Sequence, residues 1–543
     1  MIKKEYDAIV IGGGIQGLCL GAYLQRAGMQ TAIFERRHEE GGCVCTKETT
    51  APGFMHNHAV CMEFLEWMPF YLDFGLDKLG GRTIYPDAQF GIPFSDGSPP
   101  IILYNVASEE NYERTHKSIS VYSKKDADTW VKYRRKAQEL EPMFCNFFYS
   151  PPAMPTPEDP DPMQTMSRTL LDLFDLPHHL APGSGKDVID YLFETPGLRT
   201  LLYKGIEDWG TPLEMQGLAA FSLISLLFIE ANSRIMVGGT HTLAHAMVMA
   251  CVREGVEFHE KGDVKKIIVE SGKAAGVVLA DGTEVRARNL VASQADLKQT
   301  LLGMVGEENL SAHWVERTKA FKYGRSCVLG SSHMALHEAP DYRSAKHNPD
   351  INKTFITVVG VDTPEEMVEH CEEIEAGKIP TIPALFNSCL STFDPTYAPP
   401  GKHALSAWIF FPKASDLTRE EWYEVKKTYN DKILERFEKW APNMTRKNVI
   451  ADCFETPLDL QDDKLIPEGD FCYGLMCPEQ LVHNRPFLEA AQYRAEIKDL
   501  YLASSGQHPL GGVSAGVGYN VYKVISEDFN LTYKPWESTG RGY

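Results

Sequence analysis

Tyr6–Arg37, YDAIVIGGGIQGLCLGAYLQRAGMQTAIFERR, contains every part of a βαβ dinucleotide-binding unit in order. Its pattern predicts a strand over 8–11, a helix over 15–27 that Gly28 ends, and a second strand over 31–34. Two short apolar strands joined by a helix are typical of the start of a parallel, Rossmann-type sheet. The stretch therefore predicts an α/β protein that binds a dinucleotide.

Three glycines follow the first strand in GxGxxG spacing. Gly12, Gly14 and Gly17 allow a tight turn, leave the backbone open to a pyrophosphate and let the helix pack closely on the strand. Glu35 ends the second strand, where a carboxylate accepts both ribose hydroxyls of an adenosine and repels a 2′-phosphate. Basic residues and a Gly-Gly pair come next, an order that is typical of two-dinucleotide-binding-domain flavoproteins and favours FAD over NAD. The expected cofactor-binding residues here are Gly12, Gly14, Ile15, Gln16, Gly17, Glu35, Arg36, Arg37, Gly41 and Gly42.

The composition is that of an ordinary globular protein with an acidic surface. The chain has 543 residues, of which 43% are hydrophobic and 24% are charged, and its formal charge is −20. This charge argues against nucleic acid or an anionic membrane as the main partner. The sequence shows no signal or membrane-spanning segment, so we expect a cytoplasmic protein, with peripheral contact to a membrane as the alternative.

The cysteines favour a reducing compartment. All 12 are scattered without a CxxC pair, which fits free thiols better than disulfides. Cys43 and Cys45 lie where disulfide reductases carry a redox pair, but a single residue separates them, which would strain a disulfide. We interpret them as small packing residues, and we expect no metal ligands.

A second segment, 237–293, repeats the logic of the first. Gly238, Gly239 and Thr240 open a helix that runs through Arg253, and a strand, a second strand, a hairpin turn at Asp281-Gly282 and a last strand follow. A generic α/β segment is the alternative interpretation. In FAD enzymes of this layout, the expected contacts to the cofactor come from Val264, beside the adenine, and from Ala292 and Ser293 at the end of the last strand.

The third segment is 499–525, DLYLASSGQHPLGGVSAGVGYNVYKVI. We expect a strand over 500–503, a glycine-rich turn over 506–512 and a helix over 513–525. A helix N-terminus aimed at a flavin would stabilise the negative charge of the reduced ring, whereas a helix cap that merely needs glycine is the alternative. The candidate cofactor contacts are Ser505, Gly506, Gly512 and Val513.

The segments between these three are rich in aromatics, methionine and proline. The proline-rich stretch 150–163 predicts a surface loop. Residues 215–229 form the most hydrophobic run, which is shorter than the roughly 20 residues that span a bilayer. We expect a buried helix there, with the wall of an apolar substrate cavity or a membrane-dipping patch as alternatives. Trp209, Tyr493 and Tyr519 are candidates to line the cavity or to be simple core residues.

Over nearly its whole length the chain resembles the phytoene desaturase (carotenoid desaturase and isomerase) family of FAD-dependent oxidoreductases. The most telling motifs are the first glycine unit with Glu35, Gly41-Gly42, Gly53-Phe54, Pro399-Pro400-Gly401-Lys402-His403, Tyr493-Arg494 and the closing LYLASSGQHPLGGVSAGVGYN with its His508-Pro509 pair. The resemblance implies a two-dinucleotide-binding-domain flavoprotein, with a Rossmann-type FAD domain interleaved with an α+β substrate domain. The implied boundaries are 1–75, 236–300 and 482–543 for the FAD domain, and 76–235 and 301–481 for the substrate domain.

Three positions depart from the family pattern. The family usually has glycine at Ser504 and often at Leu510, and many related flavoproteins have an Asp near Ser505 that holds the ribityl chain. Serine can still hydrogen-bond, whereas Leu510 adds bulk to a turn close to the ring. We expect FAD to bind in a reshaped cavity.

The resemblance favours flavin-dependent desaturation of a C–C bond in an apolar isoprenoid-like or cyclic small molecule. A hydride leaves one carbon for flavin N5 while the neighbouring carbon loses a proton. His508 is the candidate catalytic base, because its motif places it near the flavin and a histidine titrates near neutrality; a structural histidine is the alternative. The acidic charge makes a large carotenoid the less attractive substrate.

No second strand-GxGxxG-helix unit follows, which argues against a built-in NAD(P)H domain. Electrons are therefore expected to pass to oxygen, a quinone or a partner protein. Two other functions stay open. A flavin amine oxidase shares the frame and would place a lysine opposite N5, and a non-catalytic flavin- or lipid-binding scaffold would shield the flavin from every reductant.

Overall fold

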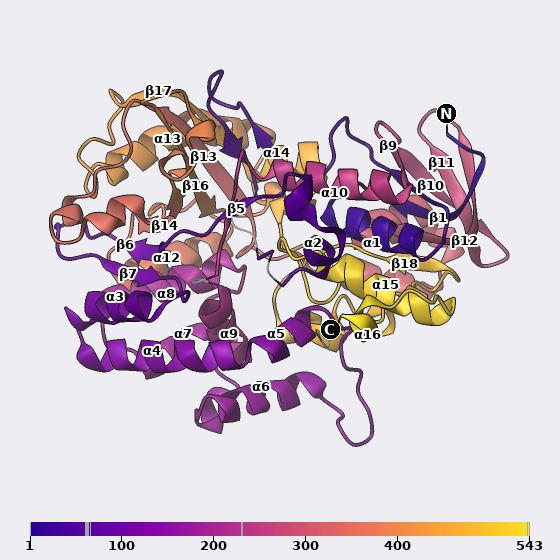
Figure 1. Ribbon diagram of the computed structural model, residues 1–543, viewed down its shortest axis with the longest axis horizontal. Coiled ribbons are helices and arrows are strands. Elements are labelled where there is room, and N and C mark those ends of the chain that lie inside the picture. The colour runs from indigo at the N-terminus through magenta and orange to yellow at the C-terminus, as the bar shows by residue number, and fades with distance from the viewer. Residues whose placement is uncertain (1, 60–63, 66, 230–231, 540, 542) are drawn as a thin grey trace.

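The computed structural model describes residues 2–59, 64–65, 67–229, 232–539, 541 and 543. Its first sheet, on the right in Figure 1, has the strand order β10-β11-β12-β1-β2-β9, with β18 beside β12. β1 pairs in parallel with β2 and β12, and β12 pairs in parallel with β18, so the carboxyl ends of these strands meet at one edge. The strands are β1 (Glu5–Ile11), β2 (Thr31–Phe34), β9 (Glu257–His259), β10 (Val264–Glu270), β11 (Lys273–Leu279), β12 (Glu284–Ser293) and β18 (Leu500–Leu502).

The helices that pack on this sheet follow the predicted segments closely at two of three places. They are α1 (Ile15–Arg26), α10 (His241–Glu254) and α15 (Gly516–Asp528). α15 begins three residues later than the sequence predicts, because Leu510, Gly512 and Ala515 all have positive φ (110°, 97° and 52°) and keep the chain in a loop. A turn at Ser271-Gly272, also with positive φ, divides the second segment into one strand more than expected.

The second sheet, at the upper left of Figure 1, has the order β17-β13-β16-β15-β14-β6-β7. All neighbouring strands are antiparallel except β14 and β6. α13 (Arg419–Phe437) packs against β17 and contributes Trp422, Tyr429 and Phe437 to the core on that side. The strands are β6 (Ala88–Ile92), β7 (Ile101–Tyr104), β13 (Leu329–Leu336), β14 (Ile356–Val359), β15 (Leu385–Ser388), β16 (His403–Phe410) and β17 (Val449–Glu455).

A helical layer lies below the second sheet in Figure 1. It consists of α3 (Glu109–Ser120), α4 (Lys124–Glu139), α5 (Glu141–Phe148), α6 (Pro162–Leu173), α7 (Gly185–Leu192), α8 (Pro196–Asp208) and α9 (Ala219–Ile229), with α12 (Pro364–Glu375) packed on α8. The proline-rich segment is a loop as predicted, except that its last two residues begin α6, where proline is tolerated at the first helical position. α6 is the outermost helix of the layer (Figure 1).

The remaining helices and strands are short. They are β3 (Thr46–Lys47), β4 (His56–Asn57), α2 (Pro69–Phe74), β5 (Thr83–Ile84), β8 (Ile235–Met236), a π-helix (Gln299–Gly306), α11 (Ala312–Ala320), α14 (Pro457–Lys464) and α16 (Pro535–Ser538). The first sheet draws its strands from three separate parts of the chain, within 5–34, 257–293 and 500–502. The second draws them from 88–104 and 329–455, so the two units are interleaved along the sequence.

The hydrophobic run 215–229 folds largely into α9, whose described side chains are mostly buried, as expected for a core helix. Among the residues that the structure describes, no helix has both the length and the apolar character needed to cross a bilayer.

Candidate functional site

A polar cavity of about 330 Å³ lies at the carboxyl edge of the first sheet, and we call it the nucleotide cavity. Its walls come from the turn after β1, the end of β2, the start of β10 and the residues that follow β12. In a parallel sheet this edge is where ligands bind, because the loops and helix N-termini converge there. Of the predicted cofactor residues, those that line it are Gly12, Gly14, Glu35, Arg36, Arg37, Gly42 and Val264.

The glycines of the first turn allow close contact between backbones. A Cβ on Gly17 would lie 2.2 Å from the carbonyl oxygen of Gly12, so any side chain there would push α1 off β1. Gly41 has a φ of 88°, and its N–H donates to the carbonyl of Gly13 at 2.8 Å. The second glycine pair therefore passes directly beside the first turn, as its spacing predicts.

Gln294, which the sequence analysis missed, occupies the notch that these glycines leave. Its Oε1 accepts the N–H of Gly17 at 2.5 Å, and a Cβ on Gly14 would lie 2.0 Å from its Nε2. The N-terminus of α1 is the point at which a phosphate would bind, so a phosphate there competes with the Gln294 amide for the same donor. Gln294 directly follows β12, and that position is the signal that could have identified it.

Glu35 lies on the wall of the nucleotide cavity, held by two backbone donors. Its carboxylate accepts the N–H of Gly13 at 2.7 Å and the N–H of Arg37 at 2.8 Å. Only 8% of the residue is exposed. Backbone donors of this kind fix a carboxylate without neutralising it, which suits a group that accepts ribose hydroxyls.

Five predicted cofactor residues do not line the cavities, and one of them is Gly17, which lies against the carbonyl of Gly12. The side chain of Gln16 turns toward α15, where its Oε1 accepts the N–H of Gly518 at 2.9 Å. Ala292 is buried in β12, and the hydroxyl of Ser293 is hydrogen-bonded to that of Thr300 at 2.7 Å. Gly506 lies behind Ser505 and is also outside the cavity walls. These residues position their neighbours, and the cavity contact passes to Gln294 and Ala295.

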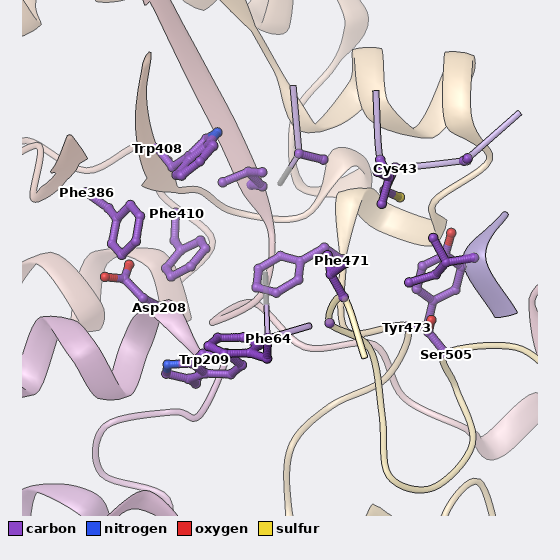
Figure 2. A pocket seen from close by; sticks show the side chains of 18 of the residues that line it. Cys43, Phe64, Asp208, Trp209, Phe386, Trp408, Phe410, Phe471, Tyr473 and Ser505 are labelled. Carbon is purple, nitrogen blue, oxygen red and sulfur yellow. The ribbon is translucent and has the colours of Figure 1, made fainter. Parts of the chain in front are cut away.

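A second cavity of about 150 Å³, shown in Figure 2, lies beside the first, and we call it the aromatic cavity. The two share the wall residues Gly42, Gln294 and Tyr473, so they adjoin, and we call the pair, which reaches from the first sheet to the second, the groove. Figure 2 shows Cys43, Tyr473 and Ser505 at one end of the aromatic cavity and the side chain of Asp208 among aromatic rings at the other. The predicted residues that line it are Ile15, Gly41, Gly42, Ser505, Gly512 and Val513, and its aromatic walls are Phe64, Trp209, Phe386, Trp408, Phe410, Phe471 and Tyr473.

Asp208 ends α8 and is the only carboxylate on the wall of the aromatic cavity among the described residues. Its Oδ1 lies 2.7 Å from Nζ of Lys204, which also contacts Oε2 of Glu207 at 2.8 Å. The three side chains share one face of α8, at i, i+3 and i+4, and all are almost fully buried. Oδ2 of Asp208 is buried and has no hydrogen-bond partner among the described residues.

One lysine cannot neutralise two buried carboxylates equally, and the pKa values of the pair are driven apart. Burial alone would raise the pKa of Glu207, but Lys204 and His370 lower it to about 2. Burial raises the pKa of Asp208 to about 7, with Lys204 opposing and the charge of Glu207 adding to the rise. Asp208 is thus a carboxyl group whose pKa is raised toward neutrality inside an aromatic cavity.

A third cavity of about 340 Å³, the apolar cavity, adjoins the aromatic one at Trp209. It lies between α5, α6 and α9, and its walls include Phe221, Ile224 and Phe228 of α9. The hydrophobic run is therefore a buried helix that also forms one wall of an apolar cavity.

His508, the predicted catalytic base, lies outside the walls of the aromatic cavity. Its side chain is on the wall of the apolar cavity, and its Nε2 donates to the carbonyl of Phe147 at 3.0 Å. Burial lowers the pKa of His508 to about 4, and the nearby charge of Arg485 adds to the effect. A buried, neutral imidazole held by a carbonyl fits the alternative interpretation, a structural histidine, and the catalytic role of His508 stays a prediction.

The other candidate residues are divided between the cavity walls and the core. Trp209 lines the aromatic and apolar cavities, whereas Tyr493 and Tyr519 are fully buried in the core. The hydroxyl of Tyr493 donates to the carbonyl of His508 at 2.9 Å and so holds the final loop. Cys43 and Cys45 are free thiols, as expected, but Cys43 also lines the aromatic cavity.

Comparisons with known proteins agree with this geometry. Residues 10–64 match the model of the NAD(P)-binding Rossmann-like domain. The chain is 29% identical to a subunit of limonene dehydrogenase from Castellaniella defragrans, with 97% of this chain and 96% of the relative covered. It is 28% identical to mouse pyridine nucleotide-disulfide oxidoreductase domain-containing protein 2 (97% and 94% covered) and 24% identical to the lycopene-forming phytoene desaturase of a Paracoccus strain (94% and 95% covered).

Solved structures resemble the fold over the whole chain. Cyclohexylamine oxidase from Brevibacterium oxydans matches with a TM-score of 0.55 at 14% identity, covering 97% of this chain and 99% of that one. An oxidoreductase from Methanosarcina mazei matches with a TM-score of 0.52 at 15% identity, covering 96% and 99%. These neighbours confirm the predicted fold class, an α/β oxidoreductase fold with a Rossmann-type domain. The chain is thus similar over nearly its full length to a limonene dehydrogenase subunit, to pyridine nucleotide-disulfide oxidoreductase domain-containing protein 2 and to a phytoene desaturase, which makes it a phytoene desaturase-like chain with a Rossmann-type domain.

Proposed function

We propose that this oxidoreductase is an FAD-dependent dehydrogenase that desaturates a C–C bond of a compact, apolar isoprenoid-like or cyclic molecule. The observation that carries the proposal is the groove, in which a polar nucleotide cavity adjoins an aromatic cavity with a carboxyl group of raised pKa at its far end. A dinucleotide would occupy the polar part, and a substrate would meet it in the aromatic part.

The residues of the nucleotide cavity fit FAD. The first turn and Gly42 would hold the pyrophosphate, Glu35 the adenosine ribose and the wall at Val264 the adenine. When bound, FAD accepts a hydride from a substrate carbon, and this is the redox chemistry that the side chains lack. The chain's own contribution is to bind, orient and deprotonate.

Asp208 is the proposed catalytic base. Its carboxylate, on the wall of the aromatic cavity, accepts the proton from the carbon next to the one that loses the hydride, so the substrate loses two hydrogens and gains a double bond. Lys204 and Glu207 are positioning residues that set the pKa of Asp208 near 7. Positioned bases of matched pKa contribute roughly 10²–10⁴-fold to a rate.

The cavity walls support an apolar substrate of modest size. Aromatic rings surround the reaction site, and the apolar cavity beside Trp209 adds about 340 Å³ of largely hydrophobic space. The name of one relative, limonene dehydrogenase, supports a cyclic isoprenoid over a carotenoid. Electrons would leave the reduced cofactor for oxygen, a quinone or a partner protein, and the same relative, which is one component of a larger enzyme by its name, supports a partner protein.

A flavin amine oxidase is the second candidate, favoured by one specific feature. A carboxylate among Trp209, Phe386 and Phe410 could also hold an ammonium group by ion pairing and cation–π contact. Lys204 weakens this alternative, because its ammonium already pairs with Asp208 in the place that such a ligand would take.

The test is product analysis under anaerobic conditions with FAD-loaded protein and an artificial electron acceptor. We expect cyclic monoterpenes, with limonene as the first probe, to give products that lack two hydrogens, as identified by mass spectrometry. Turnover of amines to aldehydes or ketones, without turnover of any isoprenoid, would overturn the proposal in favour of the amine oxidase.

A further inference from the structure

A cluster of imidazoles lies on the face of the second sheet that carries Trp408, a wall residue of the aromatic cavity. His56 and His58 are two residues apart around the short strand β4, so their side chains point to the same side. Both rings approach His333 of β13, with centroids 5.1 Å and 5.2 Å away. Glu455, the last residue of β17, completes the group.

We propose that His58, His333 and Glu455 form a binding site for a divalent transition metal of the zinc class. His58 Nδ1, His333 Nε2 and a carboxylate oxygen of Glu455 all lie within 4.8 Å of one another. Two nitrogens and a carboxylate oxygen are a donor set that Zn²⁺ takes in proteins, with a water as the fourth ligand. This site goes beyond the proposed redox reaction and does not depend on it.

The spacing of the ligand atoms suits such an ion. Two ligands about 2.05 Å from a tetrahedral ion lie about 3.4 Å apart. His333 Nε2 and Glu455 Oε2 are already 3.3 Å apart. His58 Nδ1 lies 2.7 Å from both carboxylate oxygens, which is a hydrogen-bond distance, so this contact must open by roughly 0.7 Å to admit the ion.

The outer nitrogens of both histidines are held as metal ligands usually are. Nε2 of His58 lies 2.7 Å from the hydroxyl of Thr49, and Nδ1 of His333 lies 3.0 Å from the hydroxyl of Ser406. A partner on the far nitrogen fixes the tautomer and the ring orientation. His56 differs, because its nitrogens contact hydroxyl groups on both sides and are not among the clustered ligand atoms.

Among the described residues, Glu455 has no permanently charged partner at its carboxylate. Its ion pairs within the described part of the chain are with the two imidazoles, and none is with a lysine or an arginine. Imidazoles in their metal-binding form are neutral, so the carboxylate charge stays uncompensated at a largely buried point. A divalent cation compensates it and satisfies all three donors at once.

The ion would fix a wall of the aromatic cavity. The carbonyl of His58 accepts hydrogen bonds from the Trp408 indole and the Ser331 hydroxyl, both at 3.1 Å. Trp408 lines the aromatic cavity, and so does Ala59, the residue after His58. A metal at His58 would pin this segment onto β13 and β17 and so hold the cavity shape.

The test uses tag-free, full-length, FAD-loaded protein that is stripped with a chelator and then given Zn²⁺ or Co²⁺. We expect metal analysis to find a tightly bound ion, Co²⁺ to give the visible absorption bands of a tetrahedral site, and Zn²⁺ to raise the melting temperature. Glu455→Gln and His58→Gln should each weaken binding roughly tenfold or more while the FAD content stays unchanged.

His245→Ala is the matched control, because His245 belongs to a separate, partly exposed cluster with Glu40 and His241. It should keep the ion. If the ion is lost with His245→Ala and kept with Glu455→Gln, or if stripped native protein takes up neither metal, the proposal is wrong. Flavin absorbance identifies any variant that fails to fold, and His56→Gln then serves as a second control inside the same core, expected to bind metal as the native protein does.

Discussion

The two ends of the groove are built by different physical means. At the nucleotide end, the backbone makes the site. The glycines let the N–H of Gly41 donate to the carbonyl of Gly13, and they place no side chain of their own at the N-terminus of α1. At the substrate end, side chains make the site, and the buried Lys204, Glu207 and Asp208 stand among aromatic rings. Under the proposed function, the difference teaches that cofactor binding depends on chain geometry, whereas the chemistry depends on buried charge.

The largest effect should come from a substitution that disrupts the backbone packing at the nucleotide end of the groove. In Gly17→Ala, the added methyl group would lie 2.2 Å from the carbonyl oxygen of Gly12, so α1 must move and the phosphate site is lost. We expect the purified variant to carry almost no flavin, as measured by its visible absorbance per protein. Gly303→Ala is the control, because a Cβ there meets no atom closer than 4.0 Å. Full flavin content in Gly17→Ala would contradict the assigned site.

The next effect separates the substrate end from the cofactor end. Asp208→Asn removes the proposed base but leaves its shape, so the rate of flavin reduction by substrate should fall roughly 10²–10⁴-fold with normal flavin content. Stopped-flow absorbance measures both quantities. Asp172→Asn, at an exposed carboxylate of α6, should reduce flavin at the native rate. If Asp208→Asn does so as well, another group takes the proton.

The neighbours of Asp208 should shift the pH profile in opposite directions. A base acts when deprotonated, so the reduction rate should rise with pH and level off above the pKa of Asp208, which is about 7. Lys204→Met removes an attractive charge and should move the midpoint up by about one unit, and Glu207→Gln removes a repulsive charge and should move it down by a similar amount. A midpoint that stays fixed in both variants would show that Asp208 does not control the profile.

The smallest effect concerns the point where the two ends meet. Gln294 accepts the N–H of Gly17, so Gln294→Glu puts a negative charge where the pyrophosphate would bind and should weaken FAD roughly tenfold. Gln294→Ala removes the competing amide and should bind FAD at least as tightly as the native protein. Titration of stripped protein with FAD, followed by fluorescence quenching, measures both. Equal affinity in all three proteins would place the pyrophosphate elsewhere.

The same contrast explains how much could be predicted from the sequence. Gly12, Glu35 and Gly42 were predictable because glycine spacing and a strand end dictate backbone geometry locally. Asp208 was not, because its pKa depends on Lys204 in the preceding turn, on burial and on rings from distant strands.

Contacts between distant parts of the chain explain what the sequence did not predict. The motif around His508 gives no sign that its side chain meets Phe147, which is 361 positions away. His58 and Glu455 are 397 positions apart, and only the folding of β4 onto the second sheet brings them together. Long-range pairing of this kind leaves no local pattern in a single sequence.

The most direct test of the account is the anaerobic reduction of the bound flavin, followed by its visible absorbance, with cyclic monoterpenes and with NADPH as separate reductants. The account predicts rapid bleaching by a monoterpene in the native protein, bleaching slowed at least a hundredfold in Asp208→Asn, and only slow bleaching by NADPH in both. Rapid bleaching by NADPH together with no reaction toward any monoterpene would contradict it.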